Sequence, residues 1–358
     1  MDDRVVTVTG PGRVEIVTEP AAPGPFRVRT LFTGVSAGTE LSYVKGTNPA
    51  LHTGFDTELG LFGGPAPSAY PVGRLGYMEV GEVTESSTPV VTVGDTVAMT
   101  YGHRTGYTGD PLRDRIVPLP ATLDPILGVY AAHMGPICAN GLLHAAADLH
   151  GPAVRGLGDG VAGRRVVVTG AGVVGLITAL FAKTHGAASV VVVDPTPARL
   201  AVAAALGLDT LDPTGADPAV HLKTAWRHAP GDRGADVVFQ CRGQASALQL
   251  ALRLLRPQGT VVDLAFYQGG AEDVRLGEEF HHNGLTVVCA QIGRVPRGTS
   301  GTWDRDRLSA ETITLMRTEG QAIRKHLISA MVPFEEAPAF FDDLAARRRH
   351  DLQAVLAC

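Results

Sequence analysis

Cysteine is scarce in this sequence, and the few cysteines lie far apart. Only four occur among 358 residues, at Cys138, Cys241, Cys289 and Cys358. None belongs to a C-x-x-C pair, so their spacing argues against both a disulfide framework and a structural zinc knuckle.

Lysine and long apolar runs are also scarce. The chain has four lysines and a formal net charge of −5, which argues against nucleic acid or an anionic membrane as its main partner. No apolar run reaches the roughly 18 residues that a membrane span requires, and the N-terminus lacks a signal-peptide pattern. We therefore expect a cytoplasmic protein that binds a small-molecule substrate and neither nucleic acid nor a membrane.

Glycine, in contrast, is abundant, and three glycines form the most informative motif. A strand-like apolar run over residues 166–169 leads into Gly170, Gly172 and Gly175, at the G-x-G-x-x-G spacing. A second apolar run ends in Asp194, 24 positions after the first glycine. This arrangement is typical of a dinucleotide site, in which the glycines admit the pyrophosphate and the acid binds the adenosine ribose.

The charge at Asp194 bears on the choice of cofactor. The 2′-phosphate of NADP would meet this carboxylate, and no basic residue follows it before Arg199. We therefore expect NAD, with NADP disfavoured. The residues expected to bind the cofactor are Gly170, Gly172, Val173, Val174, Gly175, Asp194, Arg199 and Cys241.

Chain length and a change in pattern near residue 125 predict two domains. Short alternating strands dominate the beginning, whereas strands and helices alternate from residue 165 onward. That alternation predicts an α/β fold with a doubly wound parallel sheet. We expect a dinucleotide-binding domain over residues 135–293, inserted between residues 1–134 and 294–358, with the active site between the domains at the carboxyl ends of the strands.

Two local predictions concern the segments around this insertion. The pattern over Ile126–Ala147 favours one continuous helix, which would place His133 on the same helical face as Asn140. The run Val90–Val93 favours a strand.

Five segments together resemble the medium-chain dehydrogenase/reductase superfamily, the relatives of zinc alcohol dehydrogenase. They are Gly34–Leu41, Gly76–Gly81, Val93–Val97, His133–Ile137 and Gly170–Gly175. The resemblance spans nearly the whole chain in the right order, and it implies a GroES-like catalytic domain beside a Rossmann domain. Two of the segments resemble a zinc-poor branch that includes bacteriochlorophyllide, sugar and cyclitol dehydrogenases.

The departures from the family pattern concern the metal. The first zinc-ligand cysteine of the family falls on Ser36 or Ala37, and its Gly-His-Glu motif reads Gly76-Tyr77-Met78. Residues 98–120, where the family carries a structural zinc lobe, contain no cysteine. Because these side chains are poor zinc ligands, we predict a site with no zinc and no other metal.

Without a metal, other side chains must stabilise the alkoxide and exchange a proton. Tyr77 takes the place of a lost ligand, although it also suits a packed tyrosine with a satisfied hydroxyl. Thr39 resembles the family's proton-relay hydroxyl or serves as a helix cap. Glu79 could orient the phenol or bind a polar substrate, or be a solvated strand carboxylate. His103 could reach the cleft as an acid or base, or be a surface-loop histidine. His133 lies near the family's third zinc ligand.

These observations predict zinc-independent hydride transfer between NAD(H) and a secondary alcohol or ketone. The polar candidates suggest a hydroxylated substrate, such as a sugar or aminocyclitol of a specialised biosynthetic pathway. An NADPH-dependent enoyl or quinone reductase and a non-catalytic NAD-binding accessory protein are the alternatives. The family resemblance also implies a homodimer, formed through the sheet edge near Leu285–Cys289.

Overall fold

A computed structural model describes residues 2–267 and 269–358. The chain divides into two compact units, one made of the chain up to His133 together with Ile328–Cys358, and the other of Met134–Leu327. The first boundary lies within one residue of the predicted one. Residues 294–327, which we expected to accompany the first part of the chain, belong instead to the second unit.

The second unit is built on a six-stranded parallel sheet with the strand order β12-β11-β10-β15-β16-β17. Its strands are β10 (Arg165–Thr169), β11 (Ser189–Val193), β12 (Asp209–Leu211), β15 (Ala235–Gln240), β16 (Leu255–Asp263) and β17 (Thr286–Cys289). This is the doubly wound order. From β10 the chain builds the sheet in one direction through β11 to β12, and it then crosses back to add β15, β16 and β17 on the other side of β10. The predicted α/β class and parallel sheet are therefore confirmed.

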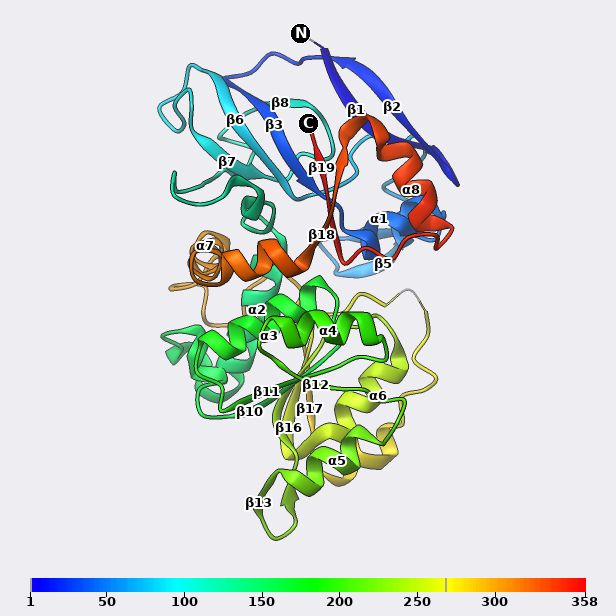
Figure 1. Ribbon diagram of the computed structural model, residues 1–358, viewed down its shortest axis with the longest axis vertical. Coiled ribbons are helices and arrows are strands. Elements are labelled where there is room, and N and C mark those ends of the chain that lie inside the picture. The colour runs from blue at the N-terminus through cyan, green and yellow to red at the C-terminus, as the bar shows by residue number, and fades with distance from the viewer. Residues whose placement is uncertain (1, 268) are drawn as a thin grey trace. The chain divides into compact units, whose positions relative to one another are not determined.

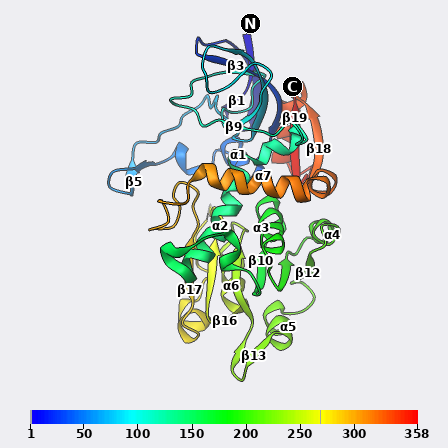
Figure 2. The same cartoon turned by 90° about the vertical axis from the view of Figure 1, so that its left-hand side faces the viewer.

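Helices cover both faces of this sheet. They are α2 (Met134–His150), α3 (Val173–Thr184), α4 (Pro197–Ala205), α5 (Pro218–Ala225), α6 (Ala245–Leu254) and α7 (Arg305–Ala322). Helices α2, α3 and α7 pack on one another, and α5 packs on α6, as Figure 1 and Figure 2 show. Because both faces are covered, the central strand β10 is apolar over residues 166–168, and Val166, Val167 and Val168 have no exposed surface.

Shorter elements complete the second unit. They are the hairpin β13 (Arg227–Ala229) and β14 (Asp232–Arg233), the short helices η3 (Gly151–Ala153) and η4 (Leu157–Gly160), and the π-helical turns η5 (Leu276–Phe280) and η6 (Ile323–Leu327).

The first unit contains a mixed sheet in the order β18-β19-β3-β6-β7-β9, with β8 also paired to β3. These strands are β3 (Phe26–Gly34), β6 (Glu79–Ser86), β7 (Thr96–Met99), β8 (Gly106–Gly109), β9 (Val117–Pro118), β18 (Ile328–Pro333) and β19 (Gln353–Ala357). The last two come from the C-terminal return, so the two ends of the sequence share one sheet (Figure 1). The arrangement agrees with the strand-rich, GroES-like domain that the resemblance implied.

Further elements of the first unit lie around this sheet. They are the ribbon β1 (Asp2–Gly10) and β2 (Arg13–Pro20), the hairpin β4 (Gly54–Asp56) and β5 (Leu61–Gly64), the helices α1 (Ala37–Val44) and α8 (Ala337–Ala345), and the short helices η1 (Pro49–Leu51), η2 (Pro125–Tyr130) and η7 (Phe334–Glu336). No helix in the described part of the chain is both long and apolar enough to cross a membrane.

The predicted helix over Ile126–Ala147 is wrong in its first half. The chain forms η2, then a turn that contains His133, and only then α2. Pro136 lies in the first turn of α2, where its missing N–H costs nothing. In a continuous helix its ring would clash with the carbonyl of Ala132, and that carbonyl instead accepts a hydrogen bond from Arg115 at 2.8 Å.

The predicted strand Val90–Val93 is also not formed. Val91 packs into the core with 3% of its surface exposed, while Val90 and Val93 are 56% and 59% exposed. Only Val91 is thus buried, and in place of strand pairing the Thr92 N–H donates to the Asp95 side chain at 2.7 Å. Gly94, with φ of +94°, turns the chain immediately into β7.

The glycine motif makes the strand-to-helix turn that the sequence predicted. Gly170 has a φ of +106°, which favours glycine. A Cβ on Gly175 would lie 1.8 Å from the carbonyl oxygen of Gly170, so this position of α3 has no room for a side chain. A Cβ on Gly172 would meet no atom within 4 Å.

The contrast between these glycines predicts their effects on stability. Gly175→Ala should lower the free energy of unfolding by about 1–3 kcal/mol, the usual cost of overpacking. Gly172→Ala should leave it within about 0.5 kcal/mol of the parent, because its φ of −81° suits alanine and the space is open. Urea unfolding of the three proteins measures both values, and equal stability of the two variants would contradict the packing role.

Candidate functional site

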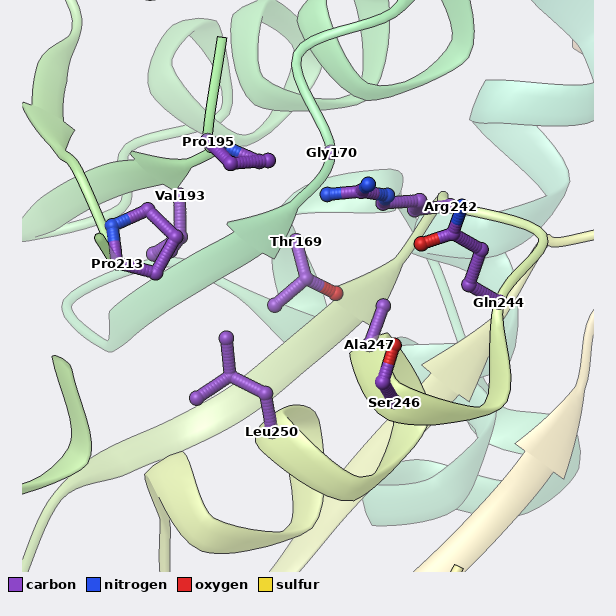
Figure 3. Close-up of a pocket in the computed structure, with 10 residues that line it drawn as sticks. All are labelled: Thr169, Gly170, Val193, Pro195, Pro213, Arg242, Gln244, Ser246, Ala247 and Leu250. Atoms are coloured by element: carbon purple, nitrogen blue, oxygen red, sulfur yellow. The ribbon is translucent and has the colours of Figure 1, made fainter. Parts of the chain in front are cut away.

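A pocket of about 200 Å³ lies at the carboxyl ends of the parallel strands, beside the glycine turn. This volume is smaller than the roughly 300–1,000 Å³ of a site that holds a whole cofactor, so it suits one part of a dinucleotide. Its walls, drawn in Figure 3, are Thr169, Gly170, Val193, Pro195, Pro213, Arg242, Gln244, Ser246, Ala247 and Leu250.

Asp194 lies in the chain between two residues of the pocket wall, Val193 and Pro195, but its side chain is turned toward backbone N–H groups. It is 2% exposed. One carboxylate oxygen accepts the N–H of Ala171 at 2.9 Å, and the other accepts the N–H of Thr196 at 2.8 Å. The carboxylate therefore ties the glycine turn to the loop after β11, and each oxygen keeps a lone pair for a further donor.

The other predicted cofactor residues differ in position. Val173 and Val174 begin α3 directly after Gly172. Cys241 follows β15, its N–H donates to the Thr169 carbonyl at 2.9 Å, and burial raises the pKa of its thiol. Arg199 is exposed on α4 and is absent from the pocket wall.

Sequence reasoning missed three polar residues of this pocket, namely Arg242, Gln244 and Ser246. All follow the end of β15, the strand that lies beside β10 across the reversal of strand order. Their signal was available, because loops at this point of a doubly wound sheet border the ligand crevice.

A chain of side-chain hydrogen bonds links the ends of the three adjacent strands β10, β15 and β16. The Thr169 hydroxyl donates to the side chain of Gln240 at 2.6 Å, and Gln240 donates to the Tyr267 hydroxyl at 3.0 Å. Tyr267 in turn donates to Asp263 at 2.8 Å. Burial raises the pKa of both Tyr267 and Asp263. These hydrogen bonds hold the carboxyl ends of β10, β15 and β16 in place beside the pocket.

The first unit gathers the predicted catalytic residues in one place. The hydroxyls of Tyr77 and Ser36 are hydrogen-bonded, and the Thr39 hydroxyl is a second partner of the phenol. The ring of His133 contacts that of Tyr77 edge-on, with 4.7 Å between centroids. Tyr77, Thr39 and His133 are partly exposed and Ser36 is buried. We call these four residues the hydroxyl cluster.

Burial decides the protonation of Tyr77. It raises the pKa of the phenol, and the hydrogen bonds from Ser36 and Thr39 offset only part of this effect. Nearby Glu40 and Glu79 raise it further. The phenol therefore keeps its proton at neutral pH and serves as a hydrogen-bond donor.

His103 and Glu79 lie beneath this cluster and are fully buried, with 1% and 0% of their surface exposed. The imidazole is 3.0 Å from Glu40 through Nε2 and 2.5 Å from the Thr33 hydroxyl through Nδ1. The Thr33 hydroxyl donates to Glu79 at 3.1 Å. A protonated His103 ring would donate to both partners, and the adjacent Glu40 carboxylate favours that form.

The expectations that Glu79 binds substrate and that His103 reaches it as acid or base do not hold, because neither side chain is accessible. Burial alone would lower the pKa of His103, but the charge and hydrogen bond of Glu40 raise it overall. Burial raises the pKa of Glu79. We define Thr33, Glu40, Glu79 and His103 as the buried network.

The His103 ring packs directly against Gly76. A Cβ there would lie 2.6–2.9 Å from three atoms of the imidazole. Gly76 also has a φ of +97°. The glycine before Tyr77 therefore leaves room for the histidine and turns the chain toward the phenol.

His133 lies in the turn before α2, so it does not share a helical face with Asn140. Asn140 is buried and donates to the carbonyls of Ala290, Gln291 and Arg294 at 3.2–3.4 Å. It therefore anchors the chain after β17 and is separate from the hydroxyl cluster.

Comparison with known proteins agrees with these features. A family model described as zinc-binding dehydrogenase matches residues 173–304. D-guloside 3-dehydrogenase of Escherichia coli (strain K12) is 31% identical over 323 residues, which covers 87% of this chain and 86% of that protein.

Solved structures share the whole fold at low sequence identity. Galactitol-1-phosphate dehydrogenase from Escherichia coli has a TM-score of 0.76 at 16% identity, covering 99% of this chain and all (100%) of that one. A putative zinc-binding dehydrogenase from Sinorhizobium meliloti 1021, bound to NADP, has a TM-score of 0.71 at 22% identity, with 100% of both chains covered.

These comparisons contradict the prediction of a zinc-free protein, since the matching family model is that of zinc-binding dehydrogenases. The prediction rested only on side-chain types at the expected ligand positions. Within residues 2–267 and 269–358, no group of three or more His, Cys, Asp or Glu side chains is placed to hold a metal ion. We therefore assign no zinc ligands among these residues and route no step of the reaction through a metal ion.

The fold, the glycine turn and the relative at 31% identity across most of both chains lead to one assignment. The chain belongs to the medium-chain dehydrogenase/reductase superfamily, with the zinc alcohol dehydrogenase-like proteins, and it is an oxidoreductase.

Proposed function

We propose that this oxidoreductase transfers a hydride between NAD(H) and a secondary alcohol carbon of a sugar-like, polyhydroxylated substrate. The observation that carries the proposal is the hydroxyl cluster, in which the Tyr77 phenol meets the hydroxyls of Ser36 and Thr39 beside the His133 ring. Such a set of donors and acceptors suits a substrate rich in hydroxyl groups. The relative named D-guloside 3-dehydrogenase supports the same substrate class.

The proposed reaction needs a hydride and a proton to leave the substrate together. A bound nicotinamide would accept the hydride of the carbinol carbon, while the hydroxyl proton passes to water and the carbon becomes a ketone. Tyr77 donates a hydrogen bond to the substrate oxygen and stabilises the alkoxide. In the reverse direction the phenol stabilises the developing oxyanion by the same hydrogen bond and water returns the proton, so Tyr77 keeps its own proton throughout.

Buried Glu40 and His103 take a positioning role in this proposal. One oxygen of Glu40 accepts the N–H of Ser36 at 2.8 Å, and the other faces His103. The pair therefore holds the start of α1, which carries Ser36 and Thr39, against Tyr77. Neither buried residue touches the substrate.

The choice of NAD follows from Asp194. Its charge is fixed beside the glycine turn by two backbone amides. Because electrostatic repulsion acts over several ångströms, this buried charge would disfavour the 2′-phosphate of NADP without direct contact.

A homodimer formed through β17 is part of the proposal by analogy with the family. This strand ends the six-stranded sheet, and its residues are largely exposed, including Val287 at 40%. An unpaired edge of this kind can pair with a second copy of the same strand.

Purified protein should reduce NAD⁺ when given methyl glycosides or polyols, and Tyr77→Phe should lower kcat by at least about 100-fold with little change in KM. NADH absorbance measures both. Tyr107→Phe is the matched control. The Tyr107 phenol donates a hydrogen bond to Asp114 at 3.0 Å and is not part of the hydroxyl cluster.

Other outcomes separate the alternative functions. Turnover confined to enones or quinones with NADPH would favour a double-bond reductase. Tight NAD⁺ binding without turnover of any alcohol, ketone or enone would favour an accessory protein. Full activity of Tyr77→Phe would remove the phenol from the mechanism.

Asp194→Asn should shift the ratio of kcat/KM values for NAD⁺ and NADP⁺ toward NADP⁺ by roughly tenfold, about 1.4 kcal/mol, because it removes the repelling charge. Steady-state kinetics with both cofactors measures the shift. Asp209→Asn removes an exposed carboxylate of β12 and should leave the ratio unchanged. An unchanged ratio in Asp194→Asn would refute its part in cofactor choice.

The buried network predicts a pH dependence of stability. Because the folded pKa of His103 is raised, its stabilisation is complete below about pH 6.5 and is lost as pH rises through that folded value. The raised pKa of Glu79 acts in the same direction. Urea unfolding between pH 6 and pH 9.5 should therefore show falling stability.

Glu40→Gln tests the origin of this dependence. It should lower the free energy of unfolding by about 3–5 kcal/mol at pH 6 and flatten the decline, because it leaves His103 buried without its partner charge. Glu82→Gln, which breaks the exposed pair with Arg29, should cost less than about 1 kcal/mol. A parent protein with no decline across this range would show that the pair is uncharged.

A further inference from the structure

Arg242 occupies a fixed place on the wall of the pocket. It comes two residues after β15, and its Cβ lies 3.2 Å from where a Cβ on Gly170 would be. Its N–H donates to the Gln240 side chain at 3.2 Å, and its carbonyl accepts from Gln240 at 2.5 Å and from the N–H of Gln244 at 2.7 Å. The backbone of this residue is thus held by the network that ends in Thr169.

The side chain, in contrast, has no partner among the described residues. Other arginines of the same unit are paired with acids, such as Arg253 with Asp217 and Arg256 with Asp232. The guanidinium of Arg242 is half-buried and has neither an ion pair nor a hydrogen bond in the described part of the chain. A partly desolvated and unpaired cation on a pocket wall calls for an anion.

The surroundings of Arg242 fit a nucleotide. Figure 3 shows its side chain extending toward the Gly170 turn, with Pro213 and Leu250 on the far side of the pocket. These apolar residues suit a flat base, while the open space at Gly172 lets an anion approach the first amides of α3. Arg242 therefore lies between an apolar slot and the glycine turn.

We propose that Arg242 binds a phosphate group of the dinucleotide, an inference that rests on the proposed function. A guanidinium presents parallel N–H groups that match two phosphate oxygens. The phosphate is either the pyrophosphate, which NAD and NADP share, or the 2′-phosphate, which only NADP carries. Asp194 disfavours the second source, and the experiment separates them.

The experiment compares the parent protein with Arg242→Gln and Arg242→Lys by calorimetric titration with adenosine, ADP, NAD⁺ and NADP⁺. Arg242→Gln should weaken binding of ADP and of both dinucleotides by roughly 10- to 100-fold, the effect of a lost charged hydrogen bond. Adenosine, which has no phosphate, should bind equally to all proteins. Arg242→Lys should recover part of the loss, because it restores the charge without the fork.

Arg227→Gln is the matched control. This arginine is exposed on β13, and its carbonyl accepts from Arg165 at the start of β10, so it lies at the opposite end of the strands from Arg242. It removes the same charge from the same unit and should leave all four affinities unchanged. Thermal melting of each variant should match the parent, since the Arg242 guanidinium supports no described contact.

Each outcome has one meaning. Equal losses for NAD⁺ and NADP⁺, accompanied by ADP, assign Arg242 to the pyrophosphate, and a loss confined to NADP⁺ assigns it to the 2′-phosphate. Unchanged affinities in Arg242→Gln, with a parent that binds NAD⁺ or NADP⁺, overturn this inference alone. A parent that binds neither dinucleotide overturns the proposed function and this inference with it.

Discussion

The contact between Gly175 and the carbonyl of Gly170 sets the geometry on which the nucleotide unit depends. Because no side chain fits there, α3 begins directly against the strand that precedes it. That close start brings the Ala171 amide to Asp194 and places the Gly170 turn beside Arg242. This steric constraint therefore sets the spacing of the Asp194 carboxylate, the Arg242 guanidinium and the first N–H groups of α3 around one pocket.

In the first unit, buried polar and charged groups position the hydroxyl cluster. An imidazole ring, two carboxyl groups and a threonine hydroxyl are removed from water beneath the hydroxyl cluster. Their value is positional, because buried ion pairs contribute little net stability but are costly to break. The same glutamate joins the two layers, since it bonds both His103 below and the Ser36 amide above.

Sequence reasoning succeeded where the signal is local. The glycine spacing and the alternation of strands and helices predicted the parallel sheet. It failed where partners are far apart in the chain: His103 is 63 positions from Glu40, and no periodicity links them. It also misjudged the helix start, where Pro136 acts against an otherwise helical pattern, and the metal, where missing ligand types were given too much weight.

The resting place of His103 against Gly76 couples two positions that lie 27 residues apart in the sequence. Any side chain at the first would displace the ring at the second, so neither can drift independently during divergence. A chain of this lineage that replaces the glycine must first shrink the histidine, and it would then lose the cation that faces Glu40. The substitutions at positions 76 and 103 can therefore occur in only one order. This packing contact restricts which closely related sequences can arise from one another by single substitutions.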